Sequence, residues 1–76
     1  MKKRIGNKVY DTQNAALIHK YTYGYYGDAR GYEETLFQNE DGFYFLYVRG
    51  GEESIHPTED IKRLGKDKAK LWLENH

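Results

Sequence analysis

The middle third of this 76-residue chain is predicted to form a β-hairpin, and this feature constrains the fold most. Two β-prone runs, 32–38 and 43–49, flank the turn residues 39–42, which end in Asp-Gly. A turn of this kind between two such runs is a strong hairpin signal. The second run is apolar on both faces, which is typical of a strand that is covered on both sides. We therefore expect it in the centre of a sheet.

The segment before the hairpin predicts further strands. Residues 4–10 form a short, moderately β-prone run that ends at a turn or cap signal. Residues 17–23 fit both helical spacing and strand alternation, so the sequence leaves residues 12–18 open between helix and strand. We favour a single turn at residues 12–15 followed by a strand.

The C-terminal segment predicts one helix. Residues 61–64 fit a last short strand, and beyond it Ala69, Trp72 and Leu73 recur at helical spacing. We expect Trp72 to pack on the sheet. The sequence thus predicts an α+β fold in a single domain over residues 1–76, with a small antiparallel sheet of four to five strands and one C-terminal α-helix packed on it.

The composition excludes several classes of function. The chain has no cysteine, which excludes disulfides, thiolate metal sites and a thiol nucleophile. Its mean hydropathy is −0.98, and no apolar run approaches the roughly 20 residues that a membrane span needs. Nor does the apolar core of a signal peptide follow the basic N-terminal residues. We expect a soluble cytoplasmic protein that uses no cofactor and does not contact membranes.

The polar residues form no recognisable catalytic or metal-binding motif. Glu33 and Glu34 are adjacent carboxylates, but neighbouring side chains of a strand point to opposite faces and do not converge. His19, His56 and His76 are too scattered for a short metal motif. We interpret His56 as a surface residue. We therefore expect no enzymatic activity, no catalytic residue and no metal site.

The zero net charge conceals a segregation along the chain. Residues 1–30 contain six basic and two acidic residues. Residues 31–60 contain one basic and eight acidic residues, and residues 61–76 contain five basic and two acidic residues. One interpretation is that the basic ends fold back and neutralise the acidic middle. The other is that the acidic residues form a local face that complements a basic, nucleic-acid-binding groove on a partner.

Two surface features are candidate partner-binding sites. Tyr25 and Tyr26 lie in a glycine-flanked loop, and such amphipathic rings are enriched at interface centres. Alternatively, one of these rings caps the sheet. The acidic candidates lie on the hairpin or at its exit, where several can share an end of the sheet; they are Glu33, Glu34, Glu40, Asp41, Glu52 and Glu53.

Four short blocks follow one another along the chain. They are KVYDT at 8–12, YEETLF at 32–37, FLYVRGG at 45–51 and IKRLGKDKAKLWLE at 61–74. Together they cover roughly half of the chain and resemble a family of small proteins from bacterial mobile elements and their phages. The resemblance implies an α+β fold and a phage or mobile-element setting, and it transfers no catalytic residue. The chain departs from the family in the loop at 50–60, which is short and acidic.

Small phage proteins without enzymatic motifs often resemble counter-defence factors such as anti-CRISPR proteins. We therefore expect a non-enzymatic protein that inhibits a host defence nuclease complex, CRISPR-Cas or another, by blocking its nucleic-acid-binding surface. It would act in the cytoplasm of the bacterial host as a monomer or homodimer. The alternative is a nucleic-acid-binding accessory protein that uses the basic C-terminal helix. The sequence pI of 6.8 argues against this alternative, since a nucleic-acid-binding domain is expected above about 9.

Overall fold

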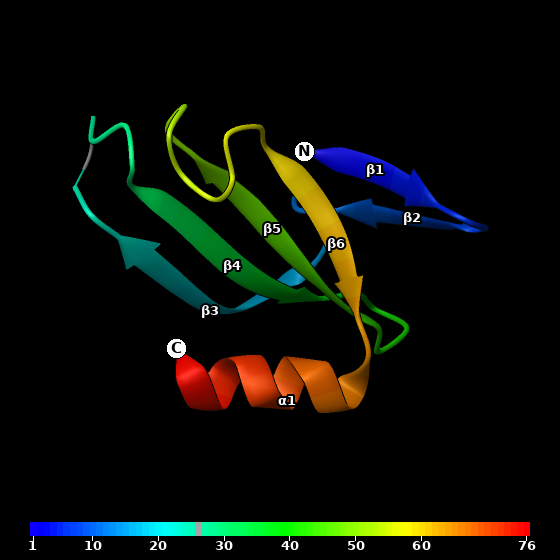
Figure 1. Ribbon diagram of the computed structural model, residues 1–76. Coiled ribbons are helices and arrows are strands. Elements are labelled where there is room, and N and C mark those ends of the chain that lie inside the picture. Colours follow the sequence, from blue (N-terminus) through cyan, green and yellow to red (C-terminus); the bar gives the residue numbers. More distant parts are fainter. Residues whose placement is uncertain (26) are drawn as a thin grey trace.

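A four-stranded antiparallel sheet separates a C-terminal helix on one face from a two-stranded hairpin on the other (Figure 1). The computed structural model describes residues 1–25 and 27–76. In chain order, the elements are β1 (Lys2–Ile5), β2 (Lys8–Asp11), β3 (Ala16–Tyr23), β4 (Tyr32–Gln38), β5 (Tyr44–Gly50), β6 (Asp60–Leu64) and α1 (Lys66–Asn75). The predicted α+β fold, with an antiparallel sheet and one C-terminal helix, is confirmed.

The predicted hairpin is formed by β4 and β5. These strands pair from Tyr32 opposite Gly50 to Gln38 opposite Tyr44. The turn ends at Gly42, whose φ of 89° lies in the left-handed region that glycine adopts without steric cost. In the sheet order β3-β4-β5-β6, strand β5 has neighbours on both sides, as its apolar pattern predicted.

Alternating side chains of the sheet form two hydrophobic clusters. The cluster on the helix face comprises Leu36, Leu46, Val48, Ala69 and Trp72. The cluster on the other face, beneath the β1–β2 hairpin, comprises Tyr10, Phe37, Phe45 and Ile61. The predicted packing of Trp72 on the sheet is therefore confirmed. Leu73, which recurs at the same helical spacing, is 39% exposed and lies outside the core.

The N-terminal segment differs in part from its prediction. The turn before β3 and the strand itself are as predicted, and a register shift between Leu17 and His19 marks a bulge in its pairing with β4. A single β run over residues 4–10 is wrong, because Gly6 and Asn7 divide the segment into β1 and β2. Gly6 has a φ of 62°, which lets the chain reverse direction there.

Candidate partner-binding site

Two loops lie side by side at one end of the sheet (Figure 1). They are the β3–β4 loop and the β5–β6 loop. The Gly51 amide donates to the Gly31 carbonyl at 2.9 Å, and the Glu53 amide donates to the Ala29 carbonyl at the same distance. These backbone hydrogen bonds join segments that lie about 20 residues apart in the sequence.

Gly51 allows this close approach of the two loops. A Cβ atom built at this position would lie 2.3 Å from the Ala29 carbonyl oxygen and 2.7 Å from its Cα. We expect Gly51→Ala to push the loops apart and to lower the free energy of unfolding by about 1 to 3 kcal/mol, as other overpacked sites do. Urea denaturation measures this loss. Gly65→Ser is the matched control, since a Cβ there meets nothing within 4 Å and serine suits the helix N-cap position that Gly65 occupies; an equal loss from both changes would contradict this role of Gly51.

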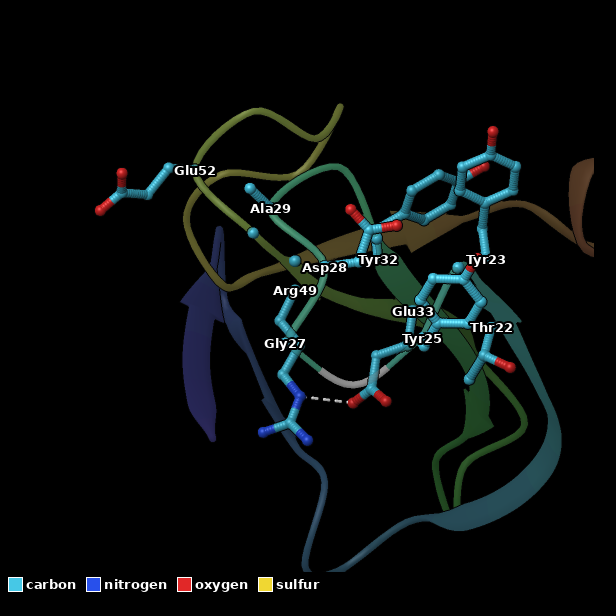
Figure 2. A pocket seen from close by; sticks show the side chains of 14 residues that line it. Thr22, Tyr23, Tyr25, Gly27, Asp28, Ala29, Tyr32, Glu33, Arg49 and Glu52 are labelled. Carbon is cyan, nitrogen blue, oxygen red and sulfur yellow. Dashed lines mark hydrogen bonds and ion pairs between the residues drawn. The ribbon is translucent and has the colours of Figure 1, made fainter.

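The paired loops and the adjoining strand ends enclose an open hollow of about 760 Å³. Among the described residues, the tyrosines that line it are Tyr23, Tyr25 and Tyr32 (Figure 2). Tyr23 and Tyr32 stack with their ring centroids 5.2 Å apart, whereas Tyr25 is 84% exposed. A large, nearly free aromatic ring beside an ordered pair is the type of feature found in the centre of protein interfaces. We call this surface the aromatic hollow.

Charged side chains surround the aromatic hollow. Glu33 and Arg49 both line it and form an ion pair (Figure 2), and Glu33 also pairs with Lys20 at 3.2 Å. The hydrogen bond and charge of Glu33 raise the pKa of the Arg49 guanidinium above its ordinary value. Asp28 and Glu52 also line the hollow, at its rim: the Asp28 carboxylate accepts a hydrogen bond from the Arg30 amide at 3.0 Å, and the Glu52 side chain extends outward, away from the rings (Figure 2). Since Glu33 is already paired with two cations, the rim carboxylates supply the free negative charge.

The predicted site residues fall into three groups. Glu33 and Glu52 line the aromatic hollow together with Tyr25, and Glu53 follows in the β5–β6 loop. Glu40 and Asp41 lie in the β4–β5 turn, at the opposite end of the sheet. Glu34 points to the helix face and is buried. Tyr26 lies outside the described residues.

Ion pairs connect the basic N-terminal third with the acidic middle of the chain. In the part of the chain that the structure describes, four such pairs join a basic residue before position 31 to a carboxylate after it: Lys3 with Asp60 at 2.6 Å, Lys8 with Asp41 at 2.5 Å, Lys20 with Glu33 at 3.2 Å and Arg30 with Glu53 at 3.9 Å. The Lys8 ammonium lowers the pKa of the Asp41 carboxyl. The interpretation that both basic ends neutralise the acidic middle is therefore confirmed only for the N-terminal end, since no lysine or arginine among the described residues 61–76 forms an ion pair.

Glu34 is the centre of a buried polar network that the sequence did not indicate. Its Oε1 accepts a hydrogen bond from Trp72 Nε1 at 2.7 Å, and its Oε2 lies 2.5 Å from His56 Nε2. A carboxylate can only accept, so His56 Nε2 carries the proton while Glu34 is ionised. The interpretation of His56 as a surface residue is wrong, because it is 8% exposed. The network ties β4, the β5–β6 loop and α1 together.

The network keeps Glu34 ionised although it is buried. Burial alone would raise the pKa of the Glu34 carboxyl, but the hydrogen bonds from Trp72 and His56 outweigh this effect and the pKa lies below its ordinary value. His76 stacks on Trp72 and lies 3.5 Å from Glu34 Oε1. Within the described part of the chain, each fully buried side-chain nitrogen or oxygen has a hydrogen-bond partner. These contacts indicate a structural role for Glu34.

Comparison of this chain with known protein families, curated proteins and solved structures found no match. Among the described residues, no three histidine or acidic side chains gather in a way that would hold a metal ion. None of the helices described is long and apolar enough to cross a membrane.

Proposed function

We propose that this chain is a non-enzymatic phage or mobile-element protein that inhibits a host defence nuclease complex. It would bind the complex, of the CRISPR-Cas type or a related one, and block its nucleic-acid-binding surface in the cytoplasm of the bacterial host. The observation that carries this proposal is the aromatic hollow, which the exposed Tyr25 ring lines together with Asp28 and Glu52, two carboxylates that form no ion pair among the described residues. The resemblance of four sequence blocks to a mobile-element family supports the biological setting.

The hollow has the composition of a protein-binding surface for a basic partner. Tyr25 supplies a large contact area at a small cost in conformational entropy, since tyrosine has only two side-chain torsions. Asp28 and Glu52 at the rim would face lysine and arginine side chains that otherwise bind phosphates. Such pairing excludes nucleic acid from a groove by occupying the same cations.

The size of the molecule is sufficient for this role. A stable interface of standard size buries about 800 Å² of each partner. The chain exposes 5513 Å² in all, so the end that contains the two loops can provide such an area. The other end then projects away from the partner.

The proposal predicts inhibition of at least one effector in a panel of purified CRISPR-Cas ribonucleoproteins of different types. We expect target-DNA binding, measured by gel shift, to fall at least about tenfold with excess protein, since the same groove is occupied. Tyr25→Ala should weaken the inhibition about tenfold or more, as truncation of an interface anchor does. Glu52→Lys should weaken it about threefold or more through charge repulsion.

Glu40→Lys is the matched control for Glu52→Lys. Both carboxylates are exposed, and in the described part of the chain neither forms an ion pair. The charge change is the same, but Glu40 lies at the opposite end of the sheet. Equal loss of inhibition in both variants would contradict a site at the hollow. A panel in which every effector keeps its full DNA binding would contradict the proposed function.

A further inference from the structure

At the end of the molecule opposite to the aromatic hollow, three segments enclose a second cleft of about 800 Å³. They are the tip of the β1–β2 hairpin, the end of the β4–β5 turn, and the junction of β6 with α1. Figure 1 shows all three at the same end of the sheet. We call this surface the basic cleft.

Cationic side chains dominate the lining of the basic cleft. Within the described residues, four basic side chains and one acidic side chain line it: Lys8, Arg63, Lys66, Lys68 and Asp67. Lys8 is held by Asp41 at 2.5 Å. Arg63, Lys66 and Lys68 are exposed and, within the described chain, form no ion pair. The cleft thus offers three free cations on one short segment.

Aromatic rings also line the basic cleft. Phe43 lines the cleft and is 49% exposed, with Lys8 Nζ 3.7 Å from its ring centroid. Tyr44 and Tyr10 also contribute to the lining. Cations that follow a phosphate backbone, combined with rings that contact bases, are typical of surfaces that bind single-stranded nucleic acid.

We infer that the basic cleft binds single-stranded nucleic acid. Arg63, Lys66 and Lys68 contact successive phosphates, and a base lies against Phe43. The neutral pI does not oppose this inference, because it averages the basic cleft with the carboxylates of the distant aromatic hollow. The inference does not rest on the proposed function, since the two surfaces lie at opposite ends and take different ligands.

Gly65 provides a variant that separates binding from folding. It is the N-cap of α1, lines the cleft, and has an extended backbone with φ −69° and ψ 163° that any residue adopts. A Cβ atom there meets nothing within 4 Å. Aspartate is a preferred N-cap residue, so Gly65→Asp should leave the helix at least as stable. At the same time it places a negative charge among the three cations.

The test is fluorescence anisotropy with labelled dT12 and U12 oligonucleotides at 25 to 200 mM NaCl. For three phosphate contacts, the slope of log K against log salt should be about −2. Gly65→Asp should weaken binding at least about fivefold with no decrease in Tm. Arg63→Gln should weaken it about threefold or more and reduce the slope by about 0.7.

Arg30→Gln is the matched control, because it removes the same charge at the opposite end of the molecule. Its affinity for dT12 should stay within about twofold of that of the unmodified chain. No binding of dT12 or U12 at 25 mM NaCl would overturn the inference. Equal losses from Arg63→Gln and Arg30→Gln, or tighter binding of a duplex of equal length, would overturn it as well. None of these results would affect inhibition through the aromatic hollow.

Discussion

Replacement of Glu34 by leucine should lower the free energy of unfolding by about 3 to 5 kcal/mol, as removal of one partner from a buried ionic network does. Leucine is close to glutamate in volume, so the loss does not come from a cavity. It comes from Trp72 Nε1 and His56 Nε2, which lose their acceptor and stay buried. Urea denaturation measures the effect, followed by far-UV circular dichroism and by the fluorescence of Trp72, the only tryptophan.

Two further variants identify the cause of this loss. In Glu34→Gln the amide oxygen still accepts from Trp72 Nε1, and the amide NH₂ donates to His56 Nε2 once the ring takes its other tautomer. This variant should therefore lower the free energy of unfolding by only about 1 to 2 kcal/mol. Glu33→Leu changes the adjacent residue, whose partners Lys20 and Arg49 are exposed, and should cost about 1 kcal/mol or less. If Glu33→Leu were as destabilising as Glu34→Leu, the buried network would not be the reason.

The Glu34 network also affects the aromatic hollow. The hydrogen bond from His56 to Glu34 attaches the β5–β6 loop to β4. The amides of Gly51 and Glu53 attach the same loop to the β3–β4 loop. Glu52 lies between these attachments. Since one loop connects the buried network with the rim of the hollow, its attachment at both points holds the loop backbone from which Glu52 projects.

The central hairpin could be predicted because its signals are local. The Asp-Gly turn and the apolar faces of residues 43–48 are sufficient to specify the strands and the central position of β5. The same holds for the helical spacing of Ala69 and Trp72. The hairpin at Gly6 and Asn7 was missed because residues 4–10 were treated as one run, although a Gly-Asn pair between β-prone residues is itself a turn signal.

The buried network could not be predicted in the same way. His56 lies 22 residues from Glu34 in a loop without a periodic pattern, and two neighbouring glutamates make its surroundings look exposed. The sequence correctly indicated that Glu33 and Glu34 point to opposite faces. It did not show which of the two is buried, because that depends on where α1 and the β5–β6 loop pack.

The segregation of charge along the chain becomes a separation in space. Ion pairs neutralise part of the acidic middle, as with Lys8 and Asp41. Among the described residues, the carboxylates of Asp28 and Glu52 stay without an ion pair at the aromatic hollow, whereas Arg63, Lys66 and Lys68 do so at the basic cleft, with the exposed Glu40 in the β4–β5 turn at the same end. A chain with zero net charge therefore offers two local surfaces of opposite sign, and each suits a different partner.

Replacement of Phe45 by alanine should lower the free energy of unfolding by about 3 to 5 kcal/mol, as for other fully buried phenylalanines. Phe45 is 0% exposed, stacks on Phe37 at 5.2 Å and meets the edge of Tyr10 at 5.4 Å. Tyr10 attaches the β1–β2 hairpin to the sheet, and a two-stranded hairpin is marginal by itself. Loss of Phe45 should therefore release this hairpin first.

Two measurements distinguish this release from a general loss of stability. Phe43→Ala is the matched control, because Phe43 is 49% exposed and its removal should cost about 1 kcal/mol or less. In native-state hydrogen exchange, Phe45→Ala should accelerate the amides of β1 and β2 more than those of α1. Glu34→Leu should do the reverse, since it acts on the helix face. If the two variants gave the same exchange pattern, the two faces of the sheet would not be independent, and loosening of β1–β2 would not be the cause of the Phe45 effect.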